Sequence, residues 1–287
     1  MELNDYLKDQ NAPSTAQRYE REISLFIHSL ERQNIVAKTA SYAQIMDYIG
    51  KLRKQQKSLA CSLHGIKKYY SFLVAIGARK DNPAKSIRLK DKRSRDIQLQ
   101  DLFTTEELEQ LLERKERYVI LKNRNKIVIS LLIYQGLTNG ELSNLELKDI
   151  DLEQGTIYIK SGRKTNKRTL KLQSKQVFWI MKYLQEDRPK LLKVDTDKLL
   201  ISKLGTAETG EGIGYILETS RYLFPNRKLN AKTIRQSVIA NLLKEGKDLR
   251  LVQAFAGHKY PSTTEMYKQN EVEELKNQIL KYHPLQA

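Results

Sequence analysis

The sequence lacks the features of exported, disulfide-bonded and membrane-spanning proteins. It has one cysteine, Cys61, in 287 residues, which excludes a disulfide framework within the chain and suits a reducing cytoplasm. No apolar run approaches the roughly 18 residues that a membrane span needs, and the first residues, MELNDYLKDQNAP, lack the apolar core of a signal peptide. With 6 prolines, 13 glycines and no repeat or low-complexity tract, the composition predicts a globular, helix-rich chain of two domains.

Acidic residues are also few for the number of basic ones. The 34 Asp and Glu residues stand against 51 Lys and Arg residues, which gives a net charge of +17 and a pI near 9.7. Such an excess on a folded chain most often indicates a polyanionic partner. A merely basic surface, ribosome binding or a membrane surface would give the same total, so the charge alone does not select DNA.

Residues 1–88 predict a small helical bundle. Apolar residues recur at helical spacing over three stretches, and Gly77 is expected to end the third helix. Three lysines on the polar faces of these helices are candidate contacts to a polyanion: Lys54, Lys67 and Lys68. The ordinary alternative for each of them is a solvated surface cation.

A basic segment follows the bundle. Residues 82–99 contain six Lys and Arg against two Asp, with no apolar periodicity long enough for a helix, and they predict an exposed linker. We place the first domain at residues 1–88, the linker at 89–102 and the second domain at 103–287. A basic linker between two basic domains suits a protein that wraps around a duplex and contacts phosphates on both sides.

The second domain is expected to be mostly helical with a small sheet. Thr104 and Glu107 have the spacing of a capping box, which predicts a helix start. Over residues 152–173, apolar residues alternate on either side of a basic turn, which predicts a β-hairpin. The remaining stretches have helical spacing, so the predicted fold class is mainly α with a small β-hairpin or sheet.

Two segments of the second domain match the motifs of one family in order. GLTNGELSNLELKDID, residues 136–151, resembles the first motif box of the tyrosine recombinases of the phage integrase family, outlined as Gly-Leu-Arg-x-x-Glu-Leu. Residues 231–269 resemble the second box, outlined as His/Lys-x-x-Arg, Leu-Gly-His and Thr-Thr-x-x-Tyr. The N-terminal bundle, the linker and Asn82-Pro83-Ala84 are similar to the core-binding domain of that family. The resemblance covers nearly the whole chain and implies a SAM-like DNA core-binding domain and an α+β catalytic domain of an Xer-like recombinase.

The resemblance implies that Tyr267 is the nucleophile, because it ends the motif TTEMY, nine residues after His258. Among the 15 tyrosines, the nearest alternatives, Tyr260 and Tyr282, hold other positions. A tyrosine attack on a backbone phosphate conserves the bond energy in a phosphotyrosyl link. We therefore expect no metal, nucleotide or other cofactor.

The same motifs imply the roles of the other site residues. His258 would hydrogen-bond a phosphate oxygen or position the nucleophile. Arg235 and Lys232 lie three residues apart on one helix face, where a guanidinium can fork onto two phosphate oxygens. The hairpin turn would supply a general acid to the leaving oxygen, with Lys164 as the first choice and Lys160 as the second. The cations of the turn are also candidate DNA contacts: Lys160, Arg163, Lys167 and Arg168.

Thr138 departs from the family pattern. It stands where the family has its first catalytic arginine, while Glu141 and Leu142 continue in register. Loss of one preorganised donor costs about 3–4 kcal/mol of transition-state stabilisation, or about a hundredfold to a thousandfold in rate. Three explanations are open. A cation from the hairpin turn or Arg124 takes the vacant place, the enzyme is slow or needs a partner for activation, or the chain binds DNA without cutting it.

The leading hypothesis is a site-specific recombinase or integrase of a bacterial cytoplasm or nucleoid, which cuts and rejoins double-stranded DNA through a 3′-phosphotyrosyl intermediate. A non-catalytic or very slow DNA-binding relative is the alternative, and a relaxing topoisomerase is the third. No membrane partner is expected. The tail over residues 271–285 is amphipathic. In the family such a helix docks on a neighbouring protomer, which implies a dimer on one site and a tetramer in synapsis, whereas packing on its own domain is the alternative.

Overall fold

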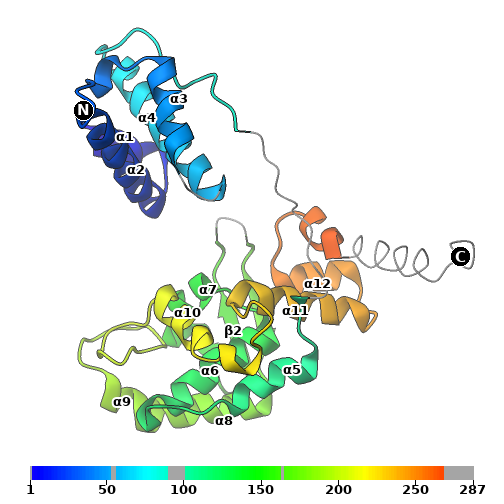
Figure 1. The fold of residues 1–287 in the computed structure, drawn as a ribbon. Helices are drawn as coiled ribbons and strands as arrows, with labels where there is room; N and C mark the ends of the chain where they lie inside the picture. The colour runs from blue at the N-terminus through cyan, green and yellow to red at the C-terminus, as the bar shows by residue number, and fades with distance from the viewer. Residues whose placement is uncertain (1, 53–55, 90–100, 163–164, 268–287) are drawn as a thin grey trace, which may run out of the picture. The chain divides into compact units, whose positions relative to one another are not determined.

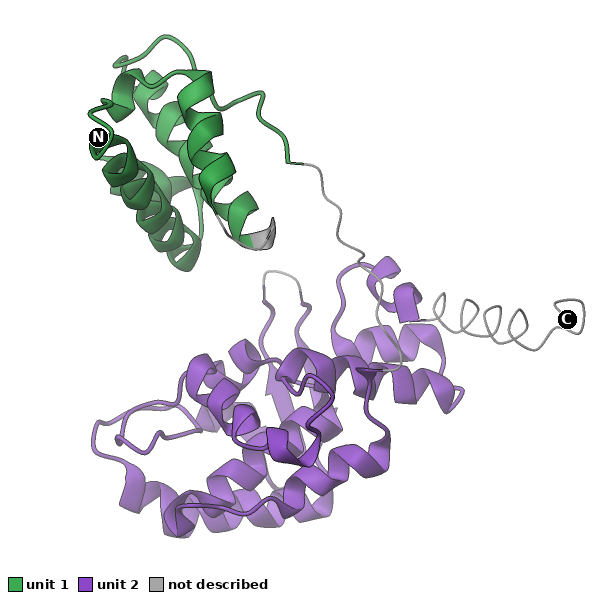
Figure 2. Cartoon of the chain, in the orientation of Figure 1, with its two compact units in different colours: residues 1–94 green, residues 95–287 purple. Residues whose placement is uncertain are grey.

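The computed structural model describes residues 2–52, 56–89, 101–162 and 165–267. It divides into two compact units, residues 1–94 and 95–287, drawn in green and purple in Figure 2. Each unit has its own hydrophobic core. None of the helices in the described ranges combines the length and the apolar character that crossing a bilayer requires.

The described part of unit 1 is a bundle of helices. Its elements, shown in blue to cyan in Figure 1, are α1 (Leu3–Gln10), α2 (Pro13–Glu31), the 3-10 turn η1 (Ala37–Thr39), α3 (Tyr42–Lys51) and α4 (Gln56–Ala75). Phe26 is fully buried, and its ring makes edge contacts with Tyr48 and Tyr70. Helix α1 is not among the three helices that the sequence predicts, because it is short and mostly polar and its anchor is the single fully buried Leu7.

The first part of the predicted linker is not exposed, and that expectation is wrong. Ala84 is fully buried and Ile87 is 3% exposed, both in the core of unit 1. Asn82 Nδ2 donates to the carbonyl of Lys67 at 2.9 Å. Ala84 and Ile87 are only two apolar residues, and such a short pattern does not predict packing. In the structure they are enough, with the hydrogen bond of Asn82, to hold residues 82–89 against α4. Residues 90–100 of the predicted linker lie outside the described residues.

Lys67 and Lys68, two of the candidate DNA contacts of unit 1, each make a hydrogen bond within that unit. Lys67 Nζ donates to the carbonyl of Ile87 at 2.7 Å, and Lys68 Nζ donates to Gln10 Oε1 at 2.6 Å. Both ammonium groups therefore hold parts of unit 1 together. Lys54, the third candidate of this domain, lies outside the described residues.

Unit 2 confirms the predicted fold class, since it is mainly helical with one small sheet. From α5 to the sheet, its elements are α5 (Thr105–Gln110), η3 (Leu111–Glu113), η4 (Val119–Leu121), α6 (Lys122–Gln135), α7 (Asn139–Asn144), η5 (Leu147–Asp149), β1 (Ile150–Asp151), β2 (Thr156–Ile159) and β3 (Arg168–Lys171). After the sheet come α8 (Ser174–Lys182), the π-turn η6 (Tyr183–Asp187), α9 (Arg188–Leu191), α10 (Gly210–Glu218), η7 (Arg221–Leu223), α11 (Ala231–Lys244) and α12 (Leu249–Ala256), and residues 262–267 are also helical. The predicted capping box of Thr104 and Glu107 begins α5.

The sheet is antiparallel in the order β1-β2-β3, which confirms the predicted hairpin. In the β2–β3 pair, Ile157 faces Leu170 and Ile159 faces Arg168. Since side chains alternate between the two faces of a strand, Arg168 points to the same buried side as Leu170, and it is 8% exposed. Arg168 is the first residue of β3, so the expectation that it lies in an exposed turn is wrong. Its contact with DNA stays a prediction.

Helix α6 lies at the centre of unit 2. It is buried on all sides and packs against α8 and α11, while α12 packs beside α11 and near β3 (Figure 1). Gly136 ends α6 with φ +60°, and Gly257 ends α12 with φ +68°, a left-handed conformation that favours glycine. These two helix ends and the start of α7 are the frame on which the candidate site is built.

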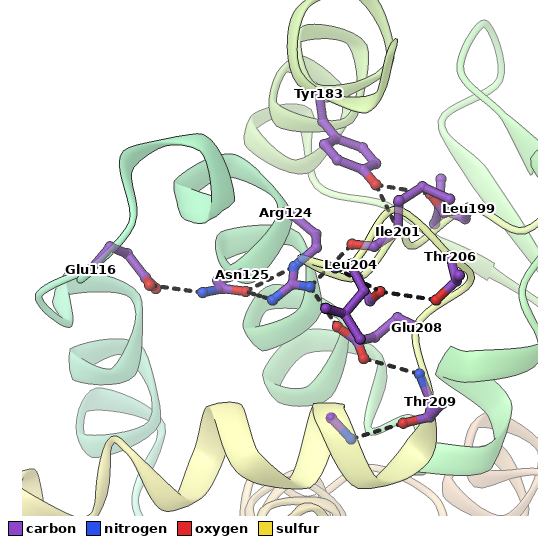
Figure 3. Close-up of polar contacts among 12 residues, drawn as sticks. Glu116, Arg124, Asn125, Tyr183, Leu199, Ile201, Leu204, Thr206, Glu208 and Thr209 are labelled. Atoms are coloured by element: carbon purple, nitrogen blue, oxygen red, sulfur yellow. Dashed lines mark hydrogen bonds and ion pairs between the residues drawn. The ribbon is translucent and has the colours of Figure 1, made fainter. Parts of the chain in front are cut away.

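Arg124, on α6, is occupied in a buried network of its own (Figure 3). Its Nη1 donates to Glu208 Oε2 and, at 3.0 Å, to the carbonyl of Ile201, and its Nε donates to Asn125 Oδ1 at 3.0 Å. Asn125 in turn donates to Glu116 at 2.7 Å. With its charge paired inside this network, Arg124 is not the cation that fills the place left by Thr138.

Replacing Glu208 by glutamine is expected to lower the free energy of unfolding of unit 2 by about 2 kcal/mol, because a buried charge-assisted hydrogen bond loses its anion. Urea unfolding followed by the fluorescence of Trp179, the single tryptophan of the chain, measures the change. Glu218→Gln is the matched control, since Glu218 pairs with Arg221 at the exposed surface and should contribute less than about 1 kcal/mol. Equal, small effects of the two variants would contradict this role of Glu208.

Candidate active site

Arg235, on α11, is fixed between the two helix ends. Its Nη1 donates to the carbonyl of Gly136 at 2.7 Å, and its Nη2 donates to the carbonyl of Ala256. The side chain is buried, with the residue 8% exposed. The nearest carboxylate, Glu141 Oε2, lies 3.9 Å from Nη1, beyond hydrogen-bond distance. The guanidinium is thus held in place mainly by neutral carbonyls, and its charge is left largely unneutralised.

Glu141, on α7, is the one carboxylate of this cluster in the described part of the chain. Its Oε1 accepts a hydrogen bond from Arg168 Nη1 at 2.7 Å, and its Oε2 accepts from the backbone N and the hydroxyl of Thr138 at 2.9 and 3.0 Å. Burial acts to raise the pKa of Glu141, but the hydrogen bond and the charge of Arg168 outweigh it, so the pKa lies below its usual value. The carboxylate is therefore ionised at neutral pH.

Thr138 has a structural task that an arginine would not perform. It is the N-cap of α7, and its hydroxyl accepts from the backbone N of Glu141 at 3.2 Å, which completes a capping box. The spacing Thr-x-x-Glu is the sequence signature of such a cap. It brings no positive charge to the site.

His258 follows the end of α12 and is buried, with 8% of the residue exposed. Its Nδ1 lies 2.9 Å from the hydroxyl of Thr264. The preceding residue, Gly257, accepts a hydrogen bond at its carbonyl from the backbone N of Asn166 at 2.8 Å, which ties the histidine loop to the β2–β3 hairpin. Burial, followed by the charges of Arg235 and Arg168, lowers the pKa of His258 to about 4. The imidazole is neutral at neutral pH.

The stability of unit 2 is expected to fall between pH 6.5 and pH 4 because of His258. The pKa of His258 in the folded state lies below its unfolded value near 6.5, so the unfolded chain binds the proton more readily. The contribution of the neutral imidazole to the free energy of unfolding is therefore fully present above pH 6.5 and is lost as the pH falls towards 4. At pH 5 the loss is about 2 kcal/mol. Urea unfolding of the wild type and of His258→Gln at pH 7 and pH 5 measures it. His28→Gln, a substitution in unit 1, is the control for the unfolding of unit 2. An unchanged pH dependence in His258→Gln would contradict the assignment.

Tyr267 is the last described residue, and it is buried with 6% exposure. It packs in a small apolar cluster with residues of α11 and α12: Ile239, Ala240, Val252 and Ala256. Burial raises the pKa of Tyr267 to about 12, although the charge of Arg235 and a hydrogen bond with Gln236 act against the rise. The phenol is therefore protonated at rest and must lose its proton as it attacks.

A cavity of about 650 Å³ joins the residues of the two motif boxes. Its lining includes Thr138, Lys232, Arg235 and Tyr267. Lys232, near the start of α11, is exposed. The structure thus brings together four of the residues that the sequence singles out, with His258 behind them on the loop that leads to Tyr267.

The candidate general acids and DNA contacts of the hairpin lie in different environments. Lys160 follows β2, where its Nζ lies 2.6 Å from Glu146 Oε2 and 3.5 Å from Asp149 Oδ2, so in this structure it is paired with carboxylates. Lys167 is exposed. Lys164 and Arg163 lie outside the described residues.

One residue of the cluster, Glu141, is not assigned to the site by the sequence motifs, and another, Arg168, is assigned only as a DNA contact of the turn. In the sequence motifs, Glu141 only shows that the first box is aligned in register. Its spacing from Thr138 nevertheless indicates a capping box. Arg168 is placed in the turn, although its alternation with Leu170 indicates a buried position. Both signals are local and are present in the sequence itself.

Comparison with known proteins gives one consistent result. Residues 101–274 match the model of the phage integrase family, and residues 2–77 match that of the phage integrase N-terminal SAM-like domain. The tyrosine recombinase XerD of Oceanobacillus iheyensis is 29% identical over 282 residues, covering 94% of this chain and 92% of that protein. The tyrosine recombinase XerC of Anoxybacillus flavithermus is 28% identical over 274 residues, covering 93% and 90%.

Solved structures share the fold at lower identity. The XerH site-specific recombinase bound to a palindromic difH substrate, in a post-cleavage complex, matches with a TM-score of 0.67 and 22% identity over 91% of this chain and 78% of that one. The Tn1549 transposon integrase in complex with a circular intermediate DNA matches with a TM-score of 0.64 and 15% identity over 96% and 99%. Both of those proteins are described on DNA.

Proposed function

The chain belongs to the phage integrase family of tyrosine recombinases, and we propose that it cuts and rejoins double-stranded DNA at specific sites with Tyr267 as the nucleophile. One observation carries the assignment of the nucleophile. Tyr267 shares a cavity with Arg235 and Lys232, from the opposite end of the same motif box. A buried tyrosine next to two cations is suited to attack an anionic phosphate.

The reaction consists of two transesterifications. The Oη of Tyr267 attacks the scissile phosphorus, the bond from phosphorus to the 5′-oxygen breaks, and the DNA 3′ end stays linked to the enzyme as a phosphotyrosyl ester. As the bond forms, the phenol proton passes to the neutral imidazole of His258 or to water, and the departing 5′-oxygen takes a proton from the general acid. The 5′-hydroxyl of another strand then attacks the ester and releases Tyr267.

The remaining residues stabilise charge and move protons. Arg235, already oriented by two carbonyls, faces the extra negative charge that the phosphate develops. His258, neutral at rest, can donate one hydrogen bond to a phosphate oxygen or hold the nucleophile. Lys164 remains our first choice for the general acid and Lys160 the second. Lys232 adds charge at the mouth of the cavity.

A second candidate function is a very slow or non-catalytic DNA-binding protein on the same fold. The observation in its favour is Thr138, which caps a helix where the family pattern has an arginine. It predicts sequence-specific binding with a steep salt dependence and no covalent product.

Trapping of covalent complexes tests the proposed function and finds the target sequence in the same experiment. The full chain is incubated with sheared genomic DNA of its host and denatured with detergent, and the protein-linked fragments are sequenced from the linked end. We expect recurrent ends at a few sites, and mass spectrometry of the digested protein should place the nucleotide on Tyr267. Specific binding without any linked fragment would favour the second candidate.

We also propose that the protein acts as a dimer on one DNA site and as a tetramer when two sites meet, in the cytoplasm. The amphipathic tail from Val272 onwards lies outside the described residues. The sequence leaves two places open for it, a neighbouring protomer and its own domain. Light scattering of the full chain and of a chain ending before Val272, each with a duplex recovered from the trapping experiment, tests the assembly. Equal masses of the two complexes would argue against docking by the tail.

A further inference from the structure

The buried polar cluster around Glu141 carries more positive than negative charge. Arg168 and Arg235 are each 8% exposed, and Glu141 is the carboxylate that both approach, at 2.7 Å and 3.9 Å. His258 is neutral and so is Tyr267. Among the residues that the structure describes, two guanidinium groups and one carboxylate leave one buried positive charge uncompensated. Burial of an unpaired charge is strongly unfavourable, so the arrangement is that of a site completed by an anion.

Arg168 contributes the unused donors of this cluster. Its Nη1 bonds Glu141, but its Nε and Nη2 are buried and have no hydrogen-bond partner among the described residues. The other two buried arginines differ, since Arg235 donates to two carbonyls and Arg124 donates to a carbonyl, an amide and a carboxylate. Each unsatisfied buried donor costs about 1–3 kcal/mol. A native structure that retains two of them on one cation indicates a ligand for that cation.

The position of Arg168 is next to the groups that face the phosphate. A Cβ on Gly257 would lie 2.7 Å from Arg168 Nη1, so β3 and the loop carrying His258 are in close approach, and α12 contacts β3. Burial is the main cause that lowers the pKa of His258 and of Arg235, and the charge of Arg168 acts in the same direction on both. Its field therefore reaches both residues across a buried interior, where charges interact more strongly than in solvent.

We propose that Arg168 supplies, from strand β3, the second positive charge that stabilises the scissile phosphate, in place of the cation that Thr138 lacks. The inference rests on the proposed function. Thr138 and Arg168 donate hydrogen bonds to the two oxygens of the Glu141 carboxylate. The guanidinium of Arg168, which comes from the β2–β3 hairpin, therefore lies close to the place that an arginine side chain at position 138 would fill. Arg235 and Arg168 then lie on two sides of the phosphate, and the hydrogen bond to Glu141 fixes the position of Arg168.

The test uses a synthetic duplex of a site recovered by the trapping experiment, with either a normal or a methylphosphonate linkage at the scissile position. A methylphosphonate carries no negative charge, so it removes the need for the cation that neutralises it. Arg168→Gln, which keeps a donor towards Glu141, should form the covalent adduct about a hundredfold to a thousandfold more slowly than the wild type on phosphate. On methylphosphonate its defect should shrink to less than about tenfold. Arg168→Lys keeps the charge but not the planar guanidinium, so on phosphate it should be less impaired than Arg168→Gln.

Arg124→Gln is the matched control, because Arg124 is also buried and ion-paired in unit 2 but belongs to another network. Any defect it has should be the same on both linkages. Equal defects of Arg168→Gln on both linkages, or none on either, would overturn the proposal and leave the nucleophilic role of Tyr267 intact. Absence of adduct with the wild type would overturn the proposed function itself.

A second variant tests whether Arg168 supplies the second positive charge, even if Arg168→Gln fails to fold. Thr138→Arg places a guanidinium at the position of the missing arginine. If Arg168 already provides the second charge, adduct formation should rise by less than about tenfold. A rise of about a hundredfold or more would show that the site of the wild type lacks that charge, and the proposal would be wrong.

Discussion

Tyr267→Phe is expected to abolish the covalent protein–DNA adduct while leaving DNA binding unchanged. The substitution removes one oxygen, the nucleophile, and leaves the rest of the side chain in place. Without the nucleophilic oxygen the covalent phosphotyrosyl link cannot form. The phenyl ring keeps the apolar contacts of the cluster around Ile239 and Val252, so the variant should fold.

Tyr260→Phe is the control for this result. Tyr260 lies seven residues earlier in the same segment and is 69% exposed, so its loss should leave adduct formation unchanged. Adduct yield on a denaturing gel and affinity from a binding titration, both at fixed salt, are compared for the three proteins. An adduct that persists in Tyr267→Phe would move the nucleophile elsewhere, with Tyr282 the next residue to test.

Arg235→Lys is expected to slow adduct formation by about a hundredfold to a thousandfold, with little change in DNA affinity. Lysine keeps the charge but is a point cation, so it cannot hold the carbonyls of Gly136 and Ala256 and present a planar fork to phosphate at once. Because the effect falls on the transition state, the single-turnover rate at saturating protein should drop while the dissociation constant stays close to that of the wild type.

Arg227→Lys provides a comparison for the change from guanidinium to ammonium. Arg227 is partly buried in the same unit and pairs with Glu107 away from the cavity, so its rate should stay within about threefold of the wild type, the usual consequence of a change outside the reacting centre. If Arg235→Lys were as active as Arg227→Lys, the fork would have no part in catalysis.

Sequence patterns predict the parts of the molecule that local rules determine. The hairpin, the capping box at Thr104 and the helical fold class are all encoded by spacing within a few residues. The two motif boxes carry Tyr267, Arg235, Lys232 and Thr138 into one cavity, since a family motif summarises contacts that no single helix or strand encodes.

The parts that sequence patterns miss depend on contacts between distant segments. Lys67 is bound to Ile87, twenty residues away, and Ala84 is buried only because α4 lies beneath it. For Arg168 the alternation with Leu170 is a local signal of burial, but its partner Glu141 lies 27 residues away and no spacing indicates that pair. The neutral state of His258 likewise follows from burial beside two arginines, which no sequence spacing indicates.

The capping box at Thr138 bears on how this chain can evolve. Arginine is a poor N-cap, so introducing it would give up the hydroxyl that accepts from Glu141, at a cost of about 1 kcal/mol to α7. It would also bring a third guanidinium to a carboxylate already shared by two. With Arg168 in place, an arginine at position 138 gains little rate and loses stability, and the two positions are epistatic. Substitution of Thr138 alone is then unfavourable, and related proteins that carry this threonine should change residue 168 only together with residue 138.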